Sequence, residues 1–147
     1  MASINSNLKY IESTWQKATV KIDTSSRQAR DEMMNALVDL SKKQIKGTRP
    51  AGQKATAGQS PMNRTGNLRK SIKGVKVRTG YGKYSAVVGP DIVYGLAVEM
   101  GGQYAPPSWR GTTAMRGFPY MEPAFDKFKK VEFPKIVNKY FRGWVVK

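Results

Sequence analysis

The 147-residue chain contains no cysteine and no histidine. The absence of cysteine excludes disulfides, thiolate metal sites and thiol nucleophiles. The absence of histidine removes the commonest general base and metal ligand, and with it every catalytic triad that depends on an imidazole. A metal site would have to be built from ten carboxylates scattered among 26 basic residues. We therefore expect no cofactor, no metal and no enzymatic activity.

Long apolar runs are also missing. No run is long enough to cross a bilayer, and the polar N-terminus, Met1-Ala-Ser-Ile-Asn-Ser, lacks the apolar core of a signal peptide. These absences predict a soluble protein made in a cytoplasm and without membrane partners. Only 39% of the residues are hydrophobic, which predicts a modest core. We expect a neighbouring subunit to cover part of the apolar surface.

Acidic residues are scarce: the chain has 26 lysines and arginines but only ten aspartates and glutamates, which gives a net charge of +16. Such a field attracts polyanions, so the charge indicates contact with nucleic acid or with acidic protein surfaces. The alternative is a solvated basic face kept for solubility. No base-reading motif accompanies the basic runs, so any DNA contact would be non-specific, through phosphates, and salt-dependent. The candidate DNA-facing residues are Lys70, Lys73, Lys76 and Arg78.

One long helix is predicted over residues 5–46. Apolar side chains recur at spacings of three and four in a stripe that consists of Leu8, Ile11, Trp15, Ala18 and Ile22. The pattern resumes between Ala29 and Leu40. The polar residues 23–26 could cap a second helix, so a kink or a break there is the alternative. A helix of this length, about 60 Å, would project from so small a domain, and projecting helices usually pack on another chain.

The whole chain, residues 1–147, reads as a single α+β domain. The fold we predict is a long N-terminal helix, a small and mostly antiparallel β-sheet, and a C-terminal helix packed on it. Residues 47–62 form a flexible loop, because they are rich in glycine, proline and small polar residues without periodicity. Residues 63–121 form the sheet core with one short helix, and residues 122–141 form the C-terminal helix.

Two strands and a turn are indicated within the sheet core. Val75 and Val77 alternate with basic residues, and residues 84–89 return as a second strand with Ala86 and Val88 on one face. The glycines between them mark a hairpin turn and not a phosphate loop. Residues 94–100 form a short helix or a third strand, residues 104–116 an irregular loop, and Phe118 begins a short strand.

Prolines punctuate the C-terminal helix. Pro123 suits a first helical turn, where a missing N–H costs nothing. Pro134 would interrupt the helix, so we expect the helix to bend there or to end near Glu132 and restart.

Three short motifs are the most informative part of the chain. They are Arg64-Thr65-Gly66-Asn67-Leu68-Arg69-Lys70-Ser71-Ile72, then Tyr94-Gly-Leu-Ala-Val-Glu-Met-Gly101, then Phe118-Pro-Tyr-Met-Glu-Pro-Ala-Phe125. In the first, Thr65 can cap a short helix from Asn67, Gly66 relaxes the turn, and Leu68 and Ile72 bury one side.

Glu99 and Glu122 are the only carboxylates near glycine-rich turns that could make a catalytic acid pair. We expect instead that Glu99 pairs with an arginine or a helix end and that Glu122 favours the start of its helix. Whether Glu99 bridges subunits or forms an internal pair is open at this stage.

The order and spacing of these motifs resembles the tail-completion, or head–tail joining, proteins of long-tailed bacteriophages, over roughly residues 60–130. The resemblance implies a structural protein whose copies form a ring at the virion neck, a hexamer or alternatively a dodecamer, after assembly in the host cytoplasm. DNA would pass through the ring. The implied neighbours are head-closure proteins on one side and tail-terminator or tail-tube proteins on the other.

The motif residues are accordingly candidates for contacts between subunits or with neighbours. These candidates are Arg64, Thr65, Gly66, Leu68, Tyr94, Glu99, Gly101, Phe118 and Met121. Two other functions stay open: a tail terminator or head-closure protein of the same neck, and, more distantly, a free non-specific DNA-binding protein driven by its net charge.

Overall fold

The computed structural model describes residues 2–48, 61–63, 65–80, 82–101 and 117–143. It has the predicted α+β architecture: a long N-terminal helix, an antiparallel two-stranded sheet and a helical C-terminal segment packed on the long helix. The predictions for Arg64, for residues 49–60 and for the loop 104–116 lie outside the described residues.

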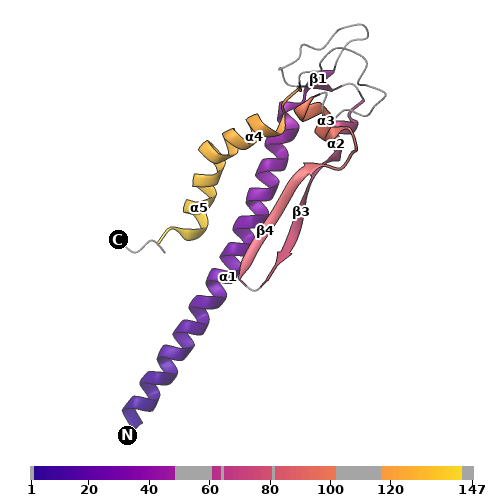
Figure 1. The fold of residues 1–147 in the computed structure, drawn as a ribbon. Coiled ribbons are helices and arrows are strands. Elements are labelled where there is room, and N and C mark those ends of the chain that lie inside the picture. Colours follow the sequence, from indigo (N-terminus) through magenta and orange to yellow (C-terminus); the bar gives the residue numbers. More distant parts are fainter. Residues whose placement is uncertain (1, 49–60, 64, 81, 102–116, 144–147) are drawn as a thin grey trace.

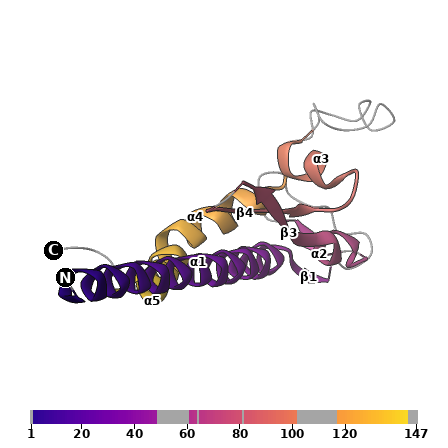
Figure 2. The same cartoon turned by 90° about the horizontal axis from the view of Figure 1, so that it is seen from below.

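The longest element is α1, Ala2–Gln44, a single helix of 43 residues. The predicted long helix is confirmed, and the alternative of a break at residues 23–26 is wrong, because these polar side chains make their contacts within the helix. Thr24 donates its hydroxyl to the Val20 carbonyl oxygen at 2.9 Å, and Asp23 pairs with Arg27 one turn later at 2.9 Å. Figures 1 and 2 show the other elements along the C-terminal part of α1, while its N-terminal part projects alone.

A hairpin of two antiparallel strands lies against α1. It consists of β3, Ile72–Thr79, and β4, Lys83–Pro90, in register from Ile72 opposite Pro90 to Thr79 opposite Lys83. Ala86 and Val88 lie on the face toward α1, as the alternation in residues 84–89 predicted. On β3, however, Val75 and Val77 are exposed and Lys76 reaches α1. The alternation therefore predicted the strand, but α1 covers the side that carries Lys76.

The C-terminal segment is a bent helical rod in three parts. It comprises α4, Met121–Lys127, a π-helical stretch η3, Phe128–Glu132, and α5, Phe133–Phe141. Of the two alternatives expected at Pro134, the bend is confirmed and the end near Glu132 is wrong, because the backbone stays helical through Glu132 and Phe133. Pro134 has no N–H to donate to the preceding turn, and the chain widens before it, so that Phe133 donates its N–H to the Phe128 carbonyl oxygen. We call Met121–Phe141 the C-terminal rod.

Two small clusters form the core. The first joins α1 to the C-terminal rod and contains Ala29, Leu40, Ala124, Phe128 and Ile136. The second lies at the C-terminal end of α1 and contains Ile45, Ile72 and Tyr120. Both are small, so the core is modest, as the composition predicted.

The remaining elements are short and surround the second cluster. β1, Lys46–Thr48, pairs in parallel with β2, Met62–Asn63. These strands lie at the two ends of the segment predicted as a loop, and no periodicity in the sequence indicated them. α2 spans Asn67–Ser71. α3, Gly95–Met100, confirms the helical alternative for this segment. Phe118 is not in a strand, and instead donates its N–H to the Val98 carbonyl oxygen at 2.6 Å.

Candidate interaction surfaces

The three sequence motifs meet at one place, which we call the motif junction. The first motif supplies Ile72 and the third supplies Tyr120, and both side chains are fully buried against Ile45 at the end of α1. The second motif supplies Gly95, whose carbonyl oxygen accepts a hydrogen bond from the Tyr120 hydroxyl at 3.2 Å. Residues far apart in the sequence therefore build one structural unit.

Glu99 closes the junction by capping α4. Its Oε2 accepts the backbone N–H groups of Tyr120 at 2.7 Å and Met121 at 3.0 Å, and its Oε1 accepts that of Glu122 at 3.0 Å. A helix leaves its first N–H groups without partners, and a carboxylate there satisfies them and meets the positive end of the helix dipole. The expectation that Glu99 meets a helix end is confirmed, and Glu122 lies in the first turn of α4 as expected.

The Tyr120 hydroxyl remains a proton donor in this setting. Burial raises the pKa of Tyr120 well above its ordinary value, and the negative charge of Glu99 adds to the effect. The protonated hydroxyl keeps its hydrogen bond to Gly95 and so ties α3 to the start of α4.

Two motif glycines adopt conformations that other residues rarely tolerate. Gly66 precedes α2 with φ 80° and ψ −8°, in the left-handed region. Gly101 ends α3 with φ 89° and ψ −162°, a region almost confined to glycine. The expected cap by Thr65 is only partly seen, because Gly66 occupies the cap position and the Thr65 hydroxyl accepts the Asn67 N–H at 3.4 Å.

The other predicted interface residues also lie at the junction. Leu68 and Met121 pack against its buried cluster, Tyr94 and Phe118 are half-buried, and Thr65 is exposed. The structure thus brings the described motif residues together, each with contacts inside the chain. Their contact with neighbouring subunits stays a prediction.

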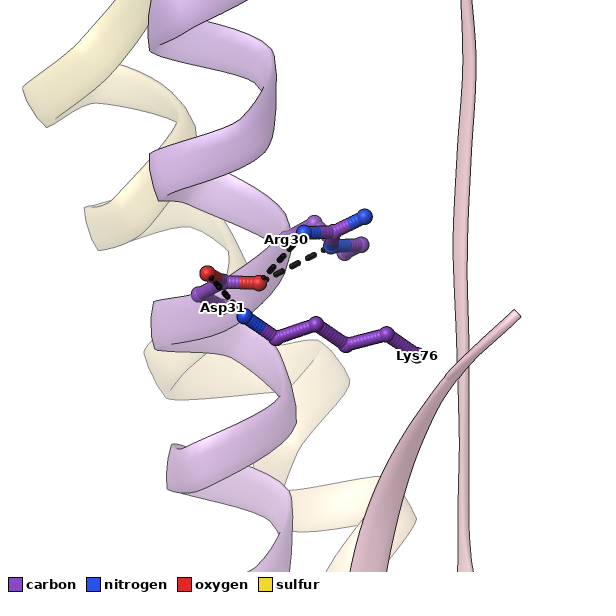
Figure 3. Close-up of polar contacts among 3 residues, drawn as sticks. All are labelled: Arg30, Asp31 and Lys76. Atoms are coloured by element: carbon purple, nitrogen blue, oxygen red, sulfur yellow. Dashed lines mark hydrogen bonds and ion pairs between the residues drawn. The ribbon is translucent and has the colours of Figure 1, made fainter. Parts of the chain in front are cut away.

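The candidate DNA-facing residues are dispersed by the fold. Lys70 is exposed on α2, Lys73 pairs with Asp91 at 3.1 Å, and Arg78 lies in β3 opposite Tyr84. Lys76 crosses to α1, where its ammonium group lies 2.7 Å from Asp31; Figure 3 shows Asp31 held between Lys76 and Arg30. The Lys76 charge therefore serves an internal pair in this structure.

Two adjacent carboxylates on α1 form ion pairs with the elements on either side of this helix, the hairpin and α5. Asp31 binds Lys76 of the hairpin, and Glu32 binds Lys139 at 2.6 Å and the Tyr140 hydroxyl at 2.7 Å, both on α5. Hydrogen bonds from Lys76 and Arg30 lower the pKa of Asp31, and hydrogen bonds from Lys139 and Tyr140 lower that of Glu32. Both carboxylates are thus held in their charged form.

Between these two sides runs an apolar groove of about 580 Å³. Its floor is α1, with Ala29, Met33 and Leu37. One wall is the hairpin, with Tyr84, Ala86 and Val88, and the other is the C-terminal rod, with Phe125, Phe128 and Phe133. This groove was not predicted from the sequence. The available signal was the four phenylalanines within residues 125–141, all of which line the groove.

A second uncovered apolar surface is the stripe on the projecting N-terminal part of α1. Leu8, Ile11, Trp15 and Ile22 are all exposed. The periodic pattern predicted that these side chains share a face, and the structure places that face in solvent. The stripe and the groove are two apolar surfaces that the described elements leave uncovered.

No protein-family model, curated protein or solved structure matches the chain. Within the described ranges, no three acidic side chains gather where they could hold a metal ion. No helix in those ranges is both long and apolar enough to span a membrane. Four features of the chain bear on its function: the motif junction, the net charge, the groove and the stripe.

Proposed function

We propose that the protein is a structural subunit of the neck of a long-tailed bacteriophage, a tail-completion protein whose copies form a ring around the DNA channel and join head to tail. The observation that carries the proposal is the motif junction. The second and third motifs are joined by the hydrogen bonds of Tyr120 with Glu99 and Gly95, and the first motif packs beside them through Ile72. A fold shared with the tail-completion family is expected to bring its motifs to one place, and this arrangement supports the proposal.

The uncovered apolar surfaces also support a role in assembly. Soluble monomers rarely expose continuous apolar patches, and those that do use them for contacts. Here a projecting helix presents Trp15 to solvent, and a groove beside it presents Phe125 and Phe133. A subunit of a ring has neighbours that would cover both.

The net charge of +16 supports contact with DNA in the channel. The contact would be non-specific, because phosphate contacts carry no sequence information. The proposed partners are further copies of the chain in a hexamer, or alternatively a dodecamer, with head-closure proteins and tail-terminator or tail-tube proteins as neighbours. The proposed location is the virion neck, reached after assembly in the host cytoplasm.

Two other functions have support from particular observations. A tail terminator or head-closure protein of the same neck would use the same small α+β fold and the same uncovered surfaces. A free non-specific DNA-binding protein would use the charge alone. The first differs from the main proposal in the neighbour that is bound, and the second requires no assembly.

Negative-stain imaging of the purified protein, alone and mixed with assembled tails, tests the proposal. We expect rings, or density that caps one end of the tails. Particles made without the protein should accumulate filled heads and finished tails that do not join. Dispersed molecules that leave tails unchanged, together with normal joining in the absence of the protein, would refute the proposal.

A further inference from the structure

We propose that the projecting N-terminal part of α1 is a docking helix for an acidic α-helix of a different protein, and that the stripe packs against an apolar seam on that helix. The inference deepens the proposed function by giving the chemistry of one neighbour, and the place of this neighbour in a phage neck rests on the proposed function. The contact itself follows from the spacing, the charge and the surroundings of residues 8–22.

The spacing of the stripe favours a helical partner. Leu8, Trp15 and Ile22 stand at intervals of seven residues, and Ile11 and Ala18 each follow three residues after one of them. This is the a and d pattern of a coiled-coil seam, which packs between the side chains of a second helix. The seam covers only about 80° of the helix circumference. Binding to a lipid surface scales with the apolar area that is buried, so a narrow seam favours a helix over a membrane.

The residues beside the seam allow a second helix to come close. Thr14 precedes Trp15 and Thr19 follows Ala18, so both border the seam. Their hydroxyls already donate hydrogen bonds within α1, to the carbonyl oxygens of Tyr10 at 2.8 Å and of Trp15 at 2.9 Å. Covering these small side chains therefore leaves neither hydroxyl donor without a partner.

The stripe continues an interface between helices that the chain already makes. Ala29 stands seven residues after Ile22 and is buried under the C-terminal rod. The C-terminal rod ends at Phe141, and Figures 1 and 2 show the N-terminal part of α1 projecting beyond it. The same side of α1 is thus covered by a helix at one end, while Trp15 is 71% exposed and Ile11 is 50% exposed at the other. A further helix would extend the established packing toward the N-terminus.

The charge of the docking helix favours an acidic partner. Residues 8–22 carry Lys9, Lys17 and Lys21 against Glu12, for a net charge of +2. Lys9 and Lys17 are exposed, and neither forms an ion pair with the described residues. Because charges interact over about 10 Å at 0.1 M salt, these lysines favour a partner helix with an excess of carboxylates, although both stand away from the seam. Complementary charge also steers the partners together and disfavours wrong ones.

A second copy of the chain lacks the acidic surface that this helix requires. Seven of the ten acidic side chains already act within the chain: Glu99 caps α4, and the other six form ion pairs, namely Asp23, Asp31, Glu32, Asp91, Asp126 and Glu132. The described residues give no such role to Glu12, Asp39 and Glu122, which belong to opposite ends of α1 and to the start of α4. With 26 lysines and arginines, a second copy would bring mainly like charge. The partner is therefore a different protein.

Nucleic acid would match the charge but not the seam. Phosphates would pair with the lysines, but they would leave Trp15 and Ile11 in water. An acidic helix with an apolar seam of its own covers both features, and tryptophan is among the commonest anchors of protein interfaces.

A synthetic acidic helix tests the inference. The probe is a fluorescein-labelled peptide of three heptads with leucine at the a and d positions and glutamate at the e and g positions, whose like charges oppose self-association. A second peptide carries lysine in place of glutamate. Fluorescence anisotropy with the full chain should show that the acidic peptide binds at least about tenfold more tightly. Equal binding, or a dissociation constant of the acidic peptide above about 1 mM, would overturn the inference.

Two substitutions on α1 separate the seam from the charge. Trp15→Glu should weaken binding of the acidic peptide by at least about tenfold, because the anchor is lost. Val20→Glu is the matched control, since it makes the same change in charge at a side chain that is 65% exposed and lies about 140° round the helix from Trp15. It should keep its affinity within about fivefold. An equal loss in both variants would show that charge alone acts, and would overturn the inference.

Lipid surfaces and self-association are the competing outcomes. Vesicles of phosphatidylglycerol and phosphatidylcholine should sediment wild type and Trp15→Glu alike. Light scattering should give the two proteins the same mass at each concentration. Binding to vesicles that Trp15→Glu abolishes would assign the stripe to a lipid surface, and self-association that Trp15→Glu abolishes would assign it to a second copy. Either result would overturn the inference.

The contact and the neck function fail separately. If Trp15→Glu loses the acidic peptide but supports normal head–tail joining, the docking helix stands and its place in the neck is removed. If the peptide tests fail while the protein still caps tails, the neck function stands and this contact is removed.

Discussion

Glu99 and Tyr120 are joined by a hydrogen bond of 2.7 Å from the Tyr120 backbone N–H to the Glu99 carboxylate. Glu99 belongs to α3 and Tyr120 is the residue before α4, so the bond ties α3 to the start of α4. Of the two roles that the sequence left open for Glu99, the structure shows the internal one. The capping contact therefore makes Glu99 a stabilising residue of the monomer.

We expect Glu99→Gln to lower the free energy of unfolding by about 1–2 kcal/mol, since the amide keeps one acceptor oxygen and loses the charge at the helix end. Urea unfolding of the monomer measures the change. Glu122→Gln is the control. Because Glu122 is exposed, this substitution should lower the free energy of unfolding by no more than about 1 kcal/mol. If Glu99→Gln unfolds like the wild type but fails to assemble, Glu99 bridges subunits instead.

Gly101→Ala should destabilise the chain by about 1–3 kcal/mol, because φ 89° with ψ −162° is a strained conformation for a residue with a Cβ. Gly89→Ala is the matched control: its φ is not positive, and a Cβ there would meet no atom within 4 Å. Thermal unfolding of both variants compares them directly. Similar melting temperatures for the two would contradict the conformation of Gly101.

Acid should loosen the hairpin and α5 from α1. Asp31 and Glu32 have folded-state pKa values below their ordinary 3.8 and 4.5, so their contribution is complete above those values and is lost as the pH falls through the lower, folded-state values. The effect is small, because both side chains are 36% exposed. Urea midpoints between pH 7 and pH 3 should fall less steeply in the double variant Asp31→Asn, Glu32→Gln.

Asp126→Asn serves as the control for this pH experiment. Its pair with Lys129, three residues later, lies within the C-terminal rod and does not connect the rod to α1 or to the hairpin. We expect its pH dependence to match that of the wild type. If Asp126→Asn flattens the curve as much as the double variant does, the cross-element pairs contribute nothing of their own.

Substitutions at Lys70 and Lys76 should have different effects: the first should change the affinity for DNA, and the second the stability of the fold. Lys70→Gln should weaken binding equally for all sequences and reduce the salt slope by about 1, since one phosphate contact is lost. Lys76→Gln should instead lower stability, because it breaks the pair with Asp31. Fluorescence anisotropy with duplex DNA at several salt concentrations measures the first effect, and urea unfolding the second. No binding near physiological salt would assign the charge to protein contacts or solubility.

Much of this architecture was contained in local patterns of the sequence. The spacing of Leu8, Ile11 and Trp15 predicts the long helix, because helical periodicity depends only on neighbours within two turns. The alternation through Val75 and Val77 predicts β3 for the same reason. The expectation of a helix bend or interruption near Pro134 follows from the missing N–H of proline alone.

The tertiary structure alone decided which of these faces is covered. Lys76, and not Val75, turns toward α1 because it shares its strand face with the buried Ile72 and with Gly74, which lies against Met34 of α1, and no local pattern reveals these neighbours. The cap by Glu99 and the groove beside Phe125 likewise join segments that are distant along the chain. Periodicity is a short-range property, whereas burial depends on which segments meet, so the sequence determined the elements and their faces while the fold determined which apolar surfaces remain uncovered.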